Sequence, residues 1–139
     1  MIALLALALQ AAAPPLTTPP LGEIGAQTLP ARGCAAFLWN VGADHRLVAM
    51  ASAESAQLRL SLDGRITDVA LADQRGDGGF GFSQISDYAG GEVTASLDMT
   101  IVTRGDLAKG AQVTQAILRV DRRGRDTLVV PVAGLIGCA

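Results

Sequence analysis

The chain of 139 residues contains two cysteines, and their positions constrain the fold more than any other feature. Cys34 lies near the start of the region expected to fold, and Cys138 is the penultimate residue. In an exported protein such a pair is typical of a structural disulfide. The alternative is a reactive thiol or a metal ligand, but the sequence has no C-x-x-C motif and a single histidine, His45. We therefore predict one bridge that joins the first strand to the last.

The N-terminus has the pattern of an export signal. Residues 2–9 form an apolar run that suits the core of a signal peptide but is too short to span a bilayer, which takes about 20 residues. Ala11-Ala12-Ala13 then offers an A-x-A cleavage pattern, and the prolines of residues 14–20 cannot continue a helix. Because no Lys or Arg precedes the run and Pro14 follows the cleavage pattern, a core helix or strand of a cytosolic protein is the alternative.

These features divide the chain into three parts. We predict a signal peptide at residues 1–13, a proline-rich leader at 14–30 and a single β domain at 31–139, in a periplasmic or secreted protein. No later segment combines the length and apolarity of a membrane span, so we expect no membrane span.

The composition limits the core and the partners. Half of the residues are hydrophobic, which is enough for one core, and the chain has only three Phe, one Trp and one Tyr. The net charge of −2 gives no electrostatic reason to expect a nucleic acid as partner. We therefore expect a core of small side chains and no nucleic-acid binding.

Residues 93–103 give the clearest strand pattern. Apolar residues at odd positions, such as Ala95 and Leu97, alternate with polar residues such as Thr94 and Asp98. One buried and one wet face are typical of an antiparallel sheet. Shorter strands are predicted at residues 35–40, 47–52 and 82–86, and residues 51–58 could form a helix or a turn.

Two hairpins can be aligned from the sequence. Asp63-Gly64 suits a two-residue type I′ turn, which sets Arg59 opposite Asp68. A three-residue loop, Arg122-Arg123-Gly124, with Gly124 left-handed, would set Asp121 opposite Arg125, Leu118 opposite Leu128 and Ala116 opposite Val130. Pro131 lacks an N–H and belongs at an edge or bulge. The fold class is all-β, an antiparallel sandwich or partly closed barrel of about seven to eight strands.

Three aromatic residues are the candidates for binding. Phe80 and Phe82 alternate with glycines in the loop of residues 76–82, where they could stack on a ligand or fold back as a lid on the sheet. Trp39 shares a strand face with Phe37, so the two rings are either the main aromatic anchor of the core, the favoured reading, or a surface platform for carbohydrate or peptide.

No pattern of catalytic or metal-binding residues emerges. Asp44-His45 with Ser52 or Ser55 has the residue types of a triad, but no nucleophile motif accompanies them. No Glu completes a calcium loop around Asp73. We therefore assign no catalytic residue, no metal and no cofactor.

The two ends of the expected β domain resemble small uncharacterised exported proteins of Gram-negative bacteria. The segments concerned are residues 33–39 (GCAAFLW) and 130–138 (VPVAGLIGC). This resemblance implies export to the periplasm and pairing of the terminal cysteines. It implies no activity and no functional residue.

The sequence favours a non-enzymatic β domain that binds a protein or a glycan through a sheet face or the loop of residues 76–82. The alternative is a structural protein of the envelope or an inhibitor of cell-wall hydrolases, which rests on analogy of fold. The sequence does not define the oligomeric state.

Overall fold

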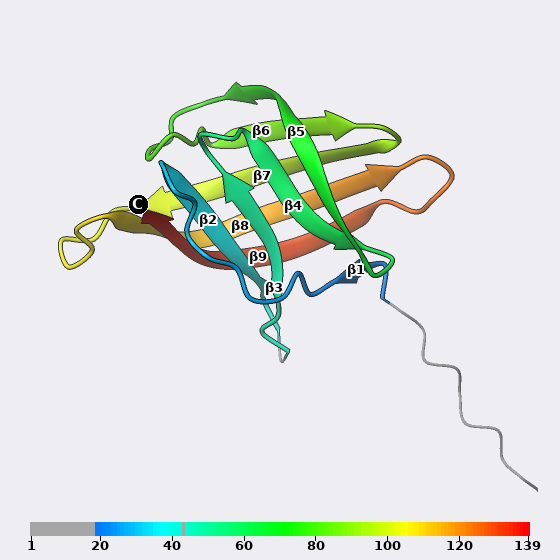
Figure 1. The fold of residues 1–139 in the computed structure, drawn as a ribbon, viewed down its shortest axis with the longest axis horizontal. Helices are drawn as coiled ribbons and strands as arrows, with labels where there is room; N and C mark the ends of the chain where they lie inside the picture. The colour runs from blue at the N-terminus through cyan, green and yellow to red at the C-terminus, as the bar shows by residue number, and fades with distance from the viewer. Residues whose placement is uncertain (1–18, 43) are drawn as a thin grey trace, which may run out of the picture.

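The computed structural model describes residues 19–42 and 44–139. Over these residues the chain is all-β, as predicted, and eight of its nine strands form a closed antiparallel barrel (Figure 1). From β2 to β9 each strand pairs with the next along the chain, and β2 and β9 pair with each other to close the barrel. The strands are β1 Leu21–Gly22, β2 Cys34–Asn40, β3 Leu47–Ser52, β4 Gln57–Leu62, β5 Arg65–Arg75, β6 Ile85–Gly90, β7 Val93–Val102, β8 Gly110–Arg122 and β9 Leu128–Cys138. The described residues include no helix that could cross a membrane.

The barrel interior is a packed core. Alternate residues of a strand point to opposite faces of the sheet, so β7 buries Ala95, Leu97 and Met99 and exposes Thr94 and Asp98, as its pattern predicts. Full burial of one such large side chain stabilises the fold by about 1.5–3 kcal/mol. The largest fully buried side chains are Leu38, Leu58, Leu60, Leu97, Met99, Leu118, Val69, Val113, Val120, Val132 and Ser86. The core is thus built mainly from aliphatic side chains, as the composition indicates.

The hairpin between β4 and β5 has the predicted register. Asp63 and Gly64 both have positive φ, at 51° and 80°, as a type I′ turn requires. Arg59 pairs with Asp68 across the strands, and its Nε lies 2.8 Å from the Asp68 carboxylate. The hydrogen bond from Arg59 lowers the pKa of Asp68. The turn residues and the cross-strand ion pair therefore specify the same register, which is why the sequence alone predicted the register of this hairpin.

The predicted register of the β8–β9 hairpin is wrong by two residues. Leu118 pairs with Val130 instead of Leu128, and five residues, 123–127, connect the strands. Gly124 has the predicted positive φ of 70°. The expected Asp121–Arg125 pair does not form, because Asp121 accepts hydrogen bonds from Thr127 and Arg119.

Pro131 does not lie at a sheet edge, one of the two places expected for it, and the irregular stretch of the β8–β9 ladder falls between Val113 and Ala116, before its partner Ile117. Pro131 pairs with Ile117 inside the closed barrel, on β9 between β8 and β2. The carbonyl of Pro131 accepts a hydrogen bond from the Val41 N–H, one residue beyond the end of β2. Its missing N–H therefore faces a strand end, where no ladder hydrogen bond is lost.

An N-terminal strap, residues 20–33, lies on the outside of the barrel and includes β1 (Figure 1). β1 pairs with the end of β4, and the Ile24 N–H donates to the Leu47 carbonyl at 2.9 Å. The Ile24 side chain is buried with Ala35 and Met50 in a small cluster separate from the main core. Part of the predicted leader, residues 14–30, therefore packs on the barrel.

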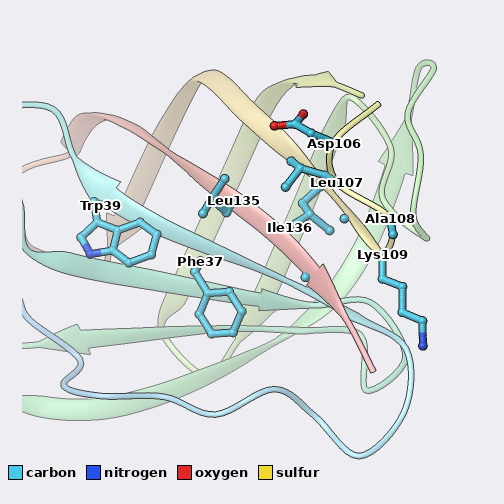
Figure 2. Close-up of a pocket in the computed structure, with 10 residues that line it drawn as sticks. Phe37, Trp39, Asp106, Leu107, Ala108, Lys109, Leu135 and Ile136 are labelled. Atoms are coloured by element: carbon cyan, nitrogen blue, oxygen red, sulfur yellow. The ribbon is translucent and has the colours of Figure 1, made fainter. Parts of the chain in front are cut away.

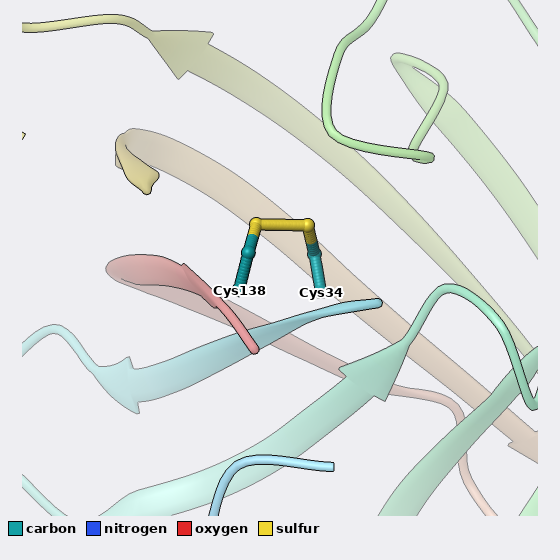
Figure 3. Close-up of a disulfide and its surroundings, with 2 residues drawn as sticks. All are labelled: Cys34 and Cys138. Atoms are coloured by element: carbon teal, nitrogen blue, oxygen red, sulfur yellow. A yellow bond between two sulfur atoms is a disulfide. The ribbon is translucent and has the colours of Figure 1, made fainter. Parts of the chain in front are cut away.

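The disulfide fastens the closing pair of strands at one end of the barrel. Cys34 begins β2 and Cys138 ends β9, and the two residues lie directly opposite each other in the ladder (Figure 3). They are bonded, as predicted, over a sequence separation of 104. A bond of this kind is consistent with an oxidising compartment outside the cytoplasm.

The opposite end of the barrel carries an ion-pair cluster. Arg122, at the end of β8, has a side chain only 10% exposed and donates to the carboxylate of Asp63 in the β4–β5 turn. Arg125 donates to both oxygens of the same carboxylate, at 2.9 and 3.1 Å. These hydrogen bonds, that of Arg125 first, lower the pKa of Asp63. The β4–β5 and β8–β9 hairpins are thereby joined across the barrel end.

Removal of the disulfide will lower stability. A closed loop of about 100 residues is worth up to about 4.7 kcal/mol in the chain-entropy model, and measured values are commonly about 2–4 kcal/mol. We expect the double variant Cys34→Ala, Cys138→Ala to melt roughly 5–15 °C below the wild type. Differential scanning calorimetry of both proteins, each with and without reductant, measures this. If reductant left the wild-type melting curve unchanged, the bridge would have no stabilising role.

Removal of the Asp63 charge will change the acid dependence of stability. Because the pKa of Asp63 is lower in the folded state than in the unfolded state, the stability from its ionised form is present at neutral pH and is lost as the pH falls through the folded pKa. Asp63→Asn should therefore be less stable than the wild type above about pH 5, and this difference should shrink below about pH 4. Urea unfolding across this pH range tests it. Asp98→Asn, at an exposed carboxylate without an ion pair among the described residues, is the control.

Candidate binding site

The last strand is apolar on both of its faces. β9 has the sequence LVVPVAGLIGC and no charged residue, although its outward positions 129, 131, 133, 135 and 137 lie outside the core. The outward positions of β7, by contrast, are Thr94, Ser96, Asp98 and Thr100. A strand with one wet face normally alternates as β7 does, whereas a continuous apolar run is typical of strands covered on both sides. The outer surface of β9 therefore differs from that of β7.

The neighbouring strand β2 adds two aromatic rings to this surface. Phe37 lies opposite Leu135 and Trp39 lies opposite Ala133 in the β2–β9 ladder. Both rings project outward, because the intervening Leu38 is fully buried inside the barrel. The favoured prediction that the two rings anchor the core is therefore wrong. Both sides of β2 are apolar, so the sequence could not indicate which side faces inward.

A groove of about 360 Å³ runs beside these rings (Figure 2). Its walls come from β2, from the end of β9 and from the segment that leads into β8. Leu107 and Leu135 are both partly open to solvent, at 36% and 49% exposure. The lining residues are Phe37, Trp39, Asp106, Leu107, Ala108, Lys109, Gly110, Leu135, Ile136 and Gly137. The groove is thus an apolar depression with two charged residues at its rim.

The rim charges differ in their partners. The Asp106 carboxylate accepts two hydrogen bonds from Arg104, at 3.1 and 3.3 Å. Lys109 makes no ion pair among the described residues, and its side chain points away from the aromatic rings (Figure 2). Shape and apolar contact, more than charge, therefore define what this groove can hold.

Exposed large apolar side chains gather on the same side of the barrel. The described residues include eight such side chains, and six of them belong to the groove, to β8 and β9 or to the residues that border them. We call this surface the outer apolar face. The six are Leu29, which lies over Gly137, with Val41, Leu107, Ile117, Val129 and Leu135. Exposed apolar side chains grouped along neighbouring strands in this way are typical of a site of interaction.

The loop of residues 76–82 does not form part of this site. Gly79 and Phe82 exchange two backbone hydrogen bonds around a tight turn, in which Phe80 and Gly81 have positive φ. Phe82 is only 6% exposed and belongs to the core, and Phe80 packs against the core. The two rings close the barrel near the disulfide end, so Phe82 presents no free ring face to a ligand.

The residues considered for catalysis lie apart. His45 lies in the exposed turn before β3, whereas Ser52 ends β3 and Ser55 follows it in the next turn. β3 spans six residues, about 20 Å. No group of three or more His, Cys, Asp or Glu residues suited to a metal occurs in residues 19–42 and 44–139.

The sequence pointed to Phe37 and Trp39 as a possible surface platform, but to no other residue of this face. Leu107 and Leu135 were missed, and so was the exposed Val129. A signal was present, since residues 128–138 contain no charge where a half-wet strand would show polar residues. That signal can be interpreted only once β9 is known to belong to a barrel whose interior is filled by other side chains.

No protein-family model matches the chain, and comparisons with curated proteins and with solved structures find no match. The resemblance of its two ends to exported bacterial proteins therefore stays a prediction. A proposal for the function therefore depends on the geometry of the outer apolar face.

Gly134 allows β9 to approach β2 closely enough to build the site. A Cβ atom at this position would overlap the Phe37 carbonyl oxygen and lie 3.1 Å from Cε3 of Trp39. We expect Gly134→Ala to destabilise the protein by roughly 1–3 kcal/mol, as overpacking does, and to shift the emission of Trp39. The sole tryptophan makes fluorescence-detected urea unfolding a suitable measurement. Gly105→Ala, where a Cβ meets nothing within 4 Å, is the control, and equal effects of the two changes would contradict this account.

Proposed function

We propose that this chain is a non-enzymatic binding domain of the periplasm or of the extracellular space, and that it binds a protein partner through its outer apolar face. The observation that carries the proposal is the composition of β9, which is uncharged on its outward side, whereas β7 in the same barrel is polar on its outward side. Exposed apolar side chains grouped on one surface are typical of a surface that another molecule covers in use.

The chemistry of the groove favours a protein over a glycan. A sugar needs polar groups that hydrogen-bond its hydroxyls in addition to an aromatic ring. Here the rings of Phe37 and Trp39 are surrounded by Leu107 and Leu135, and the carboxylate of Asp106 is already bonded to Arg104. Aliphatic and aromatic side chains with few charges are typical of the centre of a protein–protein interface.

The scaffold supports this role because it holds the face in place before binding. The outward rings of β2 and the outward side chains of β9 sit on the two strands that close the barrel, and the disulfide fixes those strands together. A surface that is already ordered loses little conformational entropy when a partner binds. The disulfide and the apolar N-terminus of the sequence both favour a location outside the cytoplasm.

Photo-cross-linking in cells will test the proposal. A benzoylphenylalanine in place of Leu107, at the rim of the groove, should form a protein adduct, and the same residue in place of Thr100, on the polar face of β7, should not. Adding Leu135→Asp to the Leu107 probe should reduce the adduct at least about tenfold, because burial of an unpaired carboxylate costs several kcal/mol. Mass spectrometry identifies the adduct.

Two results would contradict the proposal. One is an equal yield of protein adducts from positions 107 and 100. The other is an adduct from position 107 that Leu135→Asp leaves unchanged, since Leu135 is a lining residue of the groove.

A further inference from the structure

We propose that the disulfide between Cys34 and Cys138 positions one wall of the groove, so that reduction of the bond releases this wall while the barrel stays folded. The inference rests on the proposed function, because it concerns the same groove and states what controls its shape. The two cysteines are then positioning residues for binding, in addition to their effect on stability. The reasons lie in the attachment of the wall and in the packing at the end of β9.

One wall of the groove is a connection between strands. Residues 103–109 join β7 to β8, and four of them line the groove (Figure 2). The backbone hydrogen bond within this connection, from the Leu107 N–H to the Arg104 carbonyl, is local. Among the described residues, a single hydrogen bond joins the connection to a strand, and in it the Cys138 N–H donates to the Lys109 carbonyl at 3.0 Å. The end of β9 therefore determines where this wall lies.

The end of β9 has little side-chain packing to hold it in place. Gly137 lies opposite Ala35 on β2 and opposite Gly110 on β8. Cross-strand contacts between side chains stabilise a sheet, and a glycine contributes none. The next residue, Cys138, is joined covalently to β2 by the disulfide (Figure 3). The bond therefore fixes the position of the Cys138 N–H, and with it the position of Lys109.

Without the bond, the barrel stays closed and its disulfide end loosens. The β2–β9 ladder continues for six further pairs, to Asn40↔Val132, and buries Leu38 and Val132 inside the barrel. Beside the bond, the Ala139 N–H donates to the Gly33 carbonyl at 2.9 Å. Hydrogen bonds at the end of a strand open locally at little cost in free energy, whereas those of the core open only with the whole fold. Reduction should therefore release the wall and leave the fold.

A dithiol is the class of reagent that can break this bond. Cys34 and Cys138 are both partly exposed, so a small thiol can reach the sulfur atoms. The thiolate of the dithiol attacks one sulfur and forms a mixed disulfide, and its second thiol then displaces the protein. Two electrons and two protons pass to the cysteines, which become thiols, and the dithiol becomes a disulfide. Oxidised glutathione reverses the exchange.

Cleavage by endoproteinase Lys-C reports the release of the wall without any partner. Lys109 is the single lysine of the chain, so this protease has one site. In the oxidised protein the Lys109 carbonyl is hydrogen-bonded and Gly110 is buried at the start of β8, so cleavage should be slow. Dithiothreitol should accelerate it at least about tenfold by permitting local opening, and reoxidation should restore the slow rate. A cleavage rate that dithiothreitol leaves unchanged overturns the inference.

The urea dependence of this cleavage separates release of the wall from unfolding of the barrel. Cleavage through a local opening changes little in low urea because little surface is exposed, whereas cleavage through global unfolding accelerates steeply. The reduced wild type should show the shallow dependence. Leu60→Ala, at a fully buried position of β4, destabilises the whole barrel with the bond intact and should show the steep one. A steep dependence in the reduced wild type would make the bond purely structural and overturns the inference.

Photo-cross-linking from position 107 connects the wall to binding. The double variant Cys34→Ala, Cys138→Ala should give at least about tenfold less adduct than the bonded protein, because a wall that must first be ordered lowers affinity. Leu60→Ala should keep the adduct, and near-ultraviolet circular dichroism checks the fold of each variant. A folded double variant that keeps the full adduct overturns the inference and leaves the proposed function standing.

Failure of the proposed function gives a different result. If position 107 forms no protein adduct even in the bonded protein, the proposed function is wrong, and cleavage by Lys-C still shows whether the bond positions the wall. If the double variant does not fold, the reduced and reoxidised wild type decide the question through the same cleavage.

Discussion

The pairing of β2 with β9 is the interaction on which the rest of the structure depends. A chain of eight strands in which each pairs with the next leaves two open edges, and only the contact between the first and last of them removes both. The ladder from Cys34↔Cys138 to Asn40↔Val132 supplies that contact, with the disulfide at its end. Closure brings together residues about 100 positions apart. The outer apolar face therefore exists only because the barrel is closed.

Local chemistry could be predicted from the sequence, and contacts between distant hairpins could not. The Asp63-Gly64 turn and the Arg59–Asp68 pair depend on residues close in the chain, so their register followed from the sequence alone. The β8–β9 register failed because Arg125 takes its partner, Asp63, from a hairpin 62 residues away. Because the Asp63 carboxylate pairs with Arg125, the five-residue β8–β9 loop leaves the Arg125 charge paired. The short bulged turn was expected to pair that charge with Asp121. A charged side chain pairs with a neighbour in sequence only when the fold brings no more favourable partner close to it.

The candidate site was only partly predictable for a related reason. β2 is apolar at successive positions, so period-two alternation cannot decide whether Leu38 or Trp39 faces the core. The structure resolves this because the interior is filled by small and aliphatic side chains, which leaves the two large rings outside. Phe82 is the opposite case. It lies in a glycine-rich loop, which is typical of an exposed segment, but its ring is buried at the end of the barrel. In both cases the space left by other strands, rather than local pattern, determines where an aromatic ring lies.

The N-terminal strap already covers one part of the apolar outer surface. Over β2 and β3 the strap buries Ile24 against Ala35 and Met50, with Phe37 at the border of the cluster. It then passes Leu29 over Gly137 and ends at the disulfide, without covering Trp39 or Leu135. One part of the outer surface is thus covered by the chain itself, through a branched aliphatic side chain set between strands. The adjoining part, beside Trp39 and Leu135, has the same apolar character and no such cover among residues 19–42 and 44–139, so its chemistry suits an apolar side chain of another molecule.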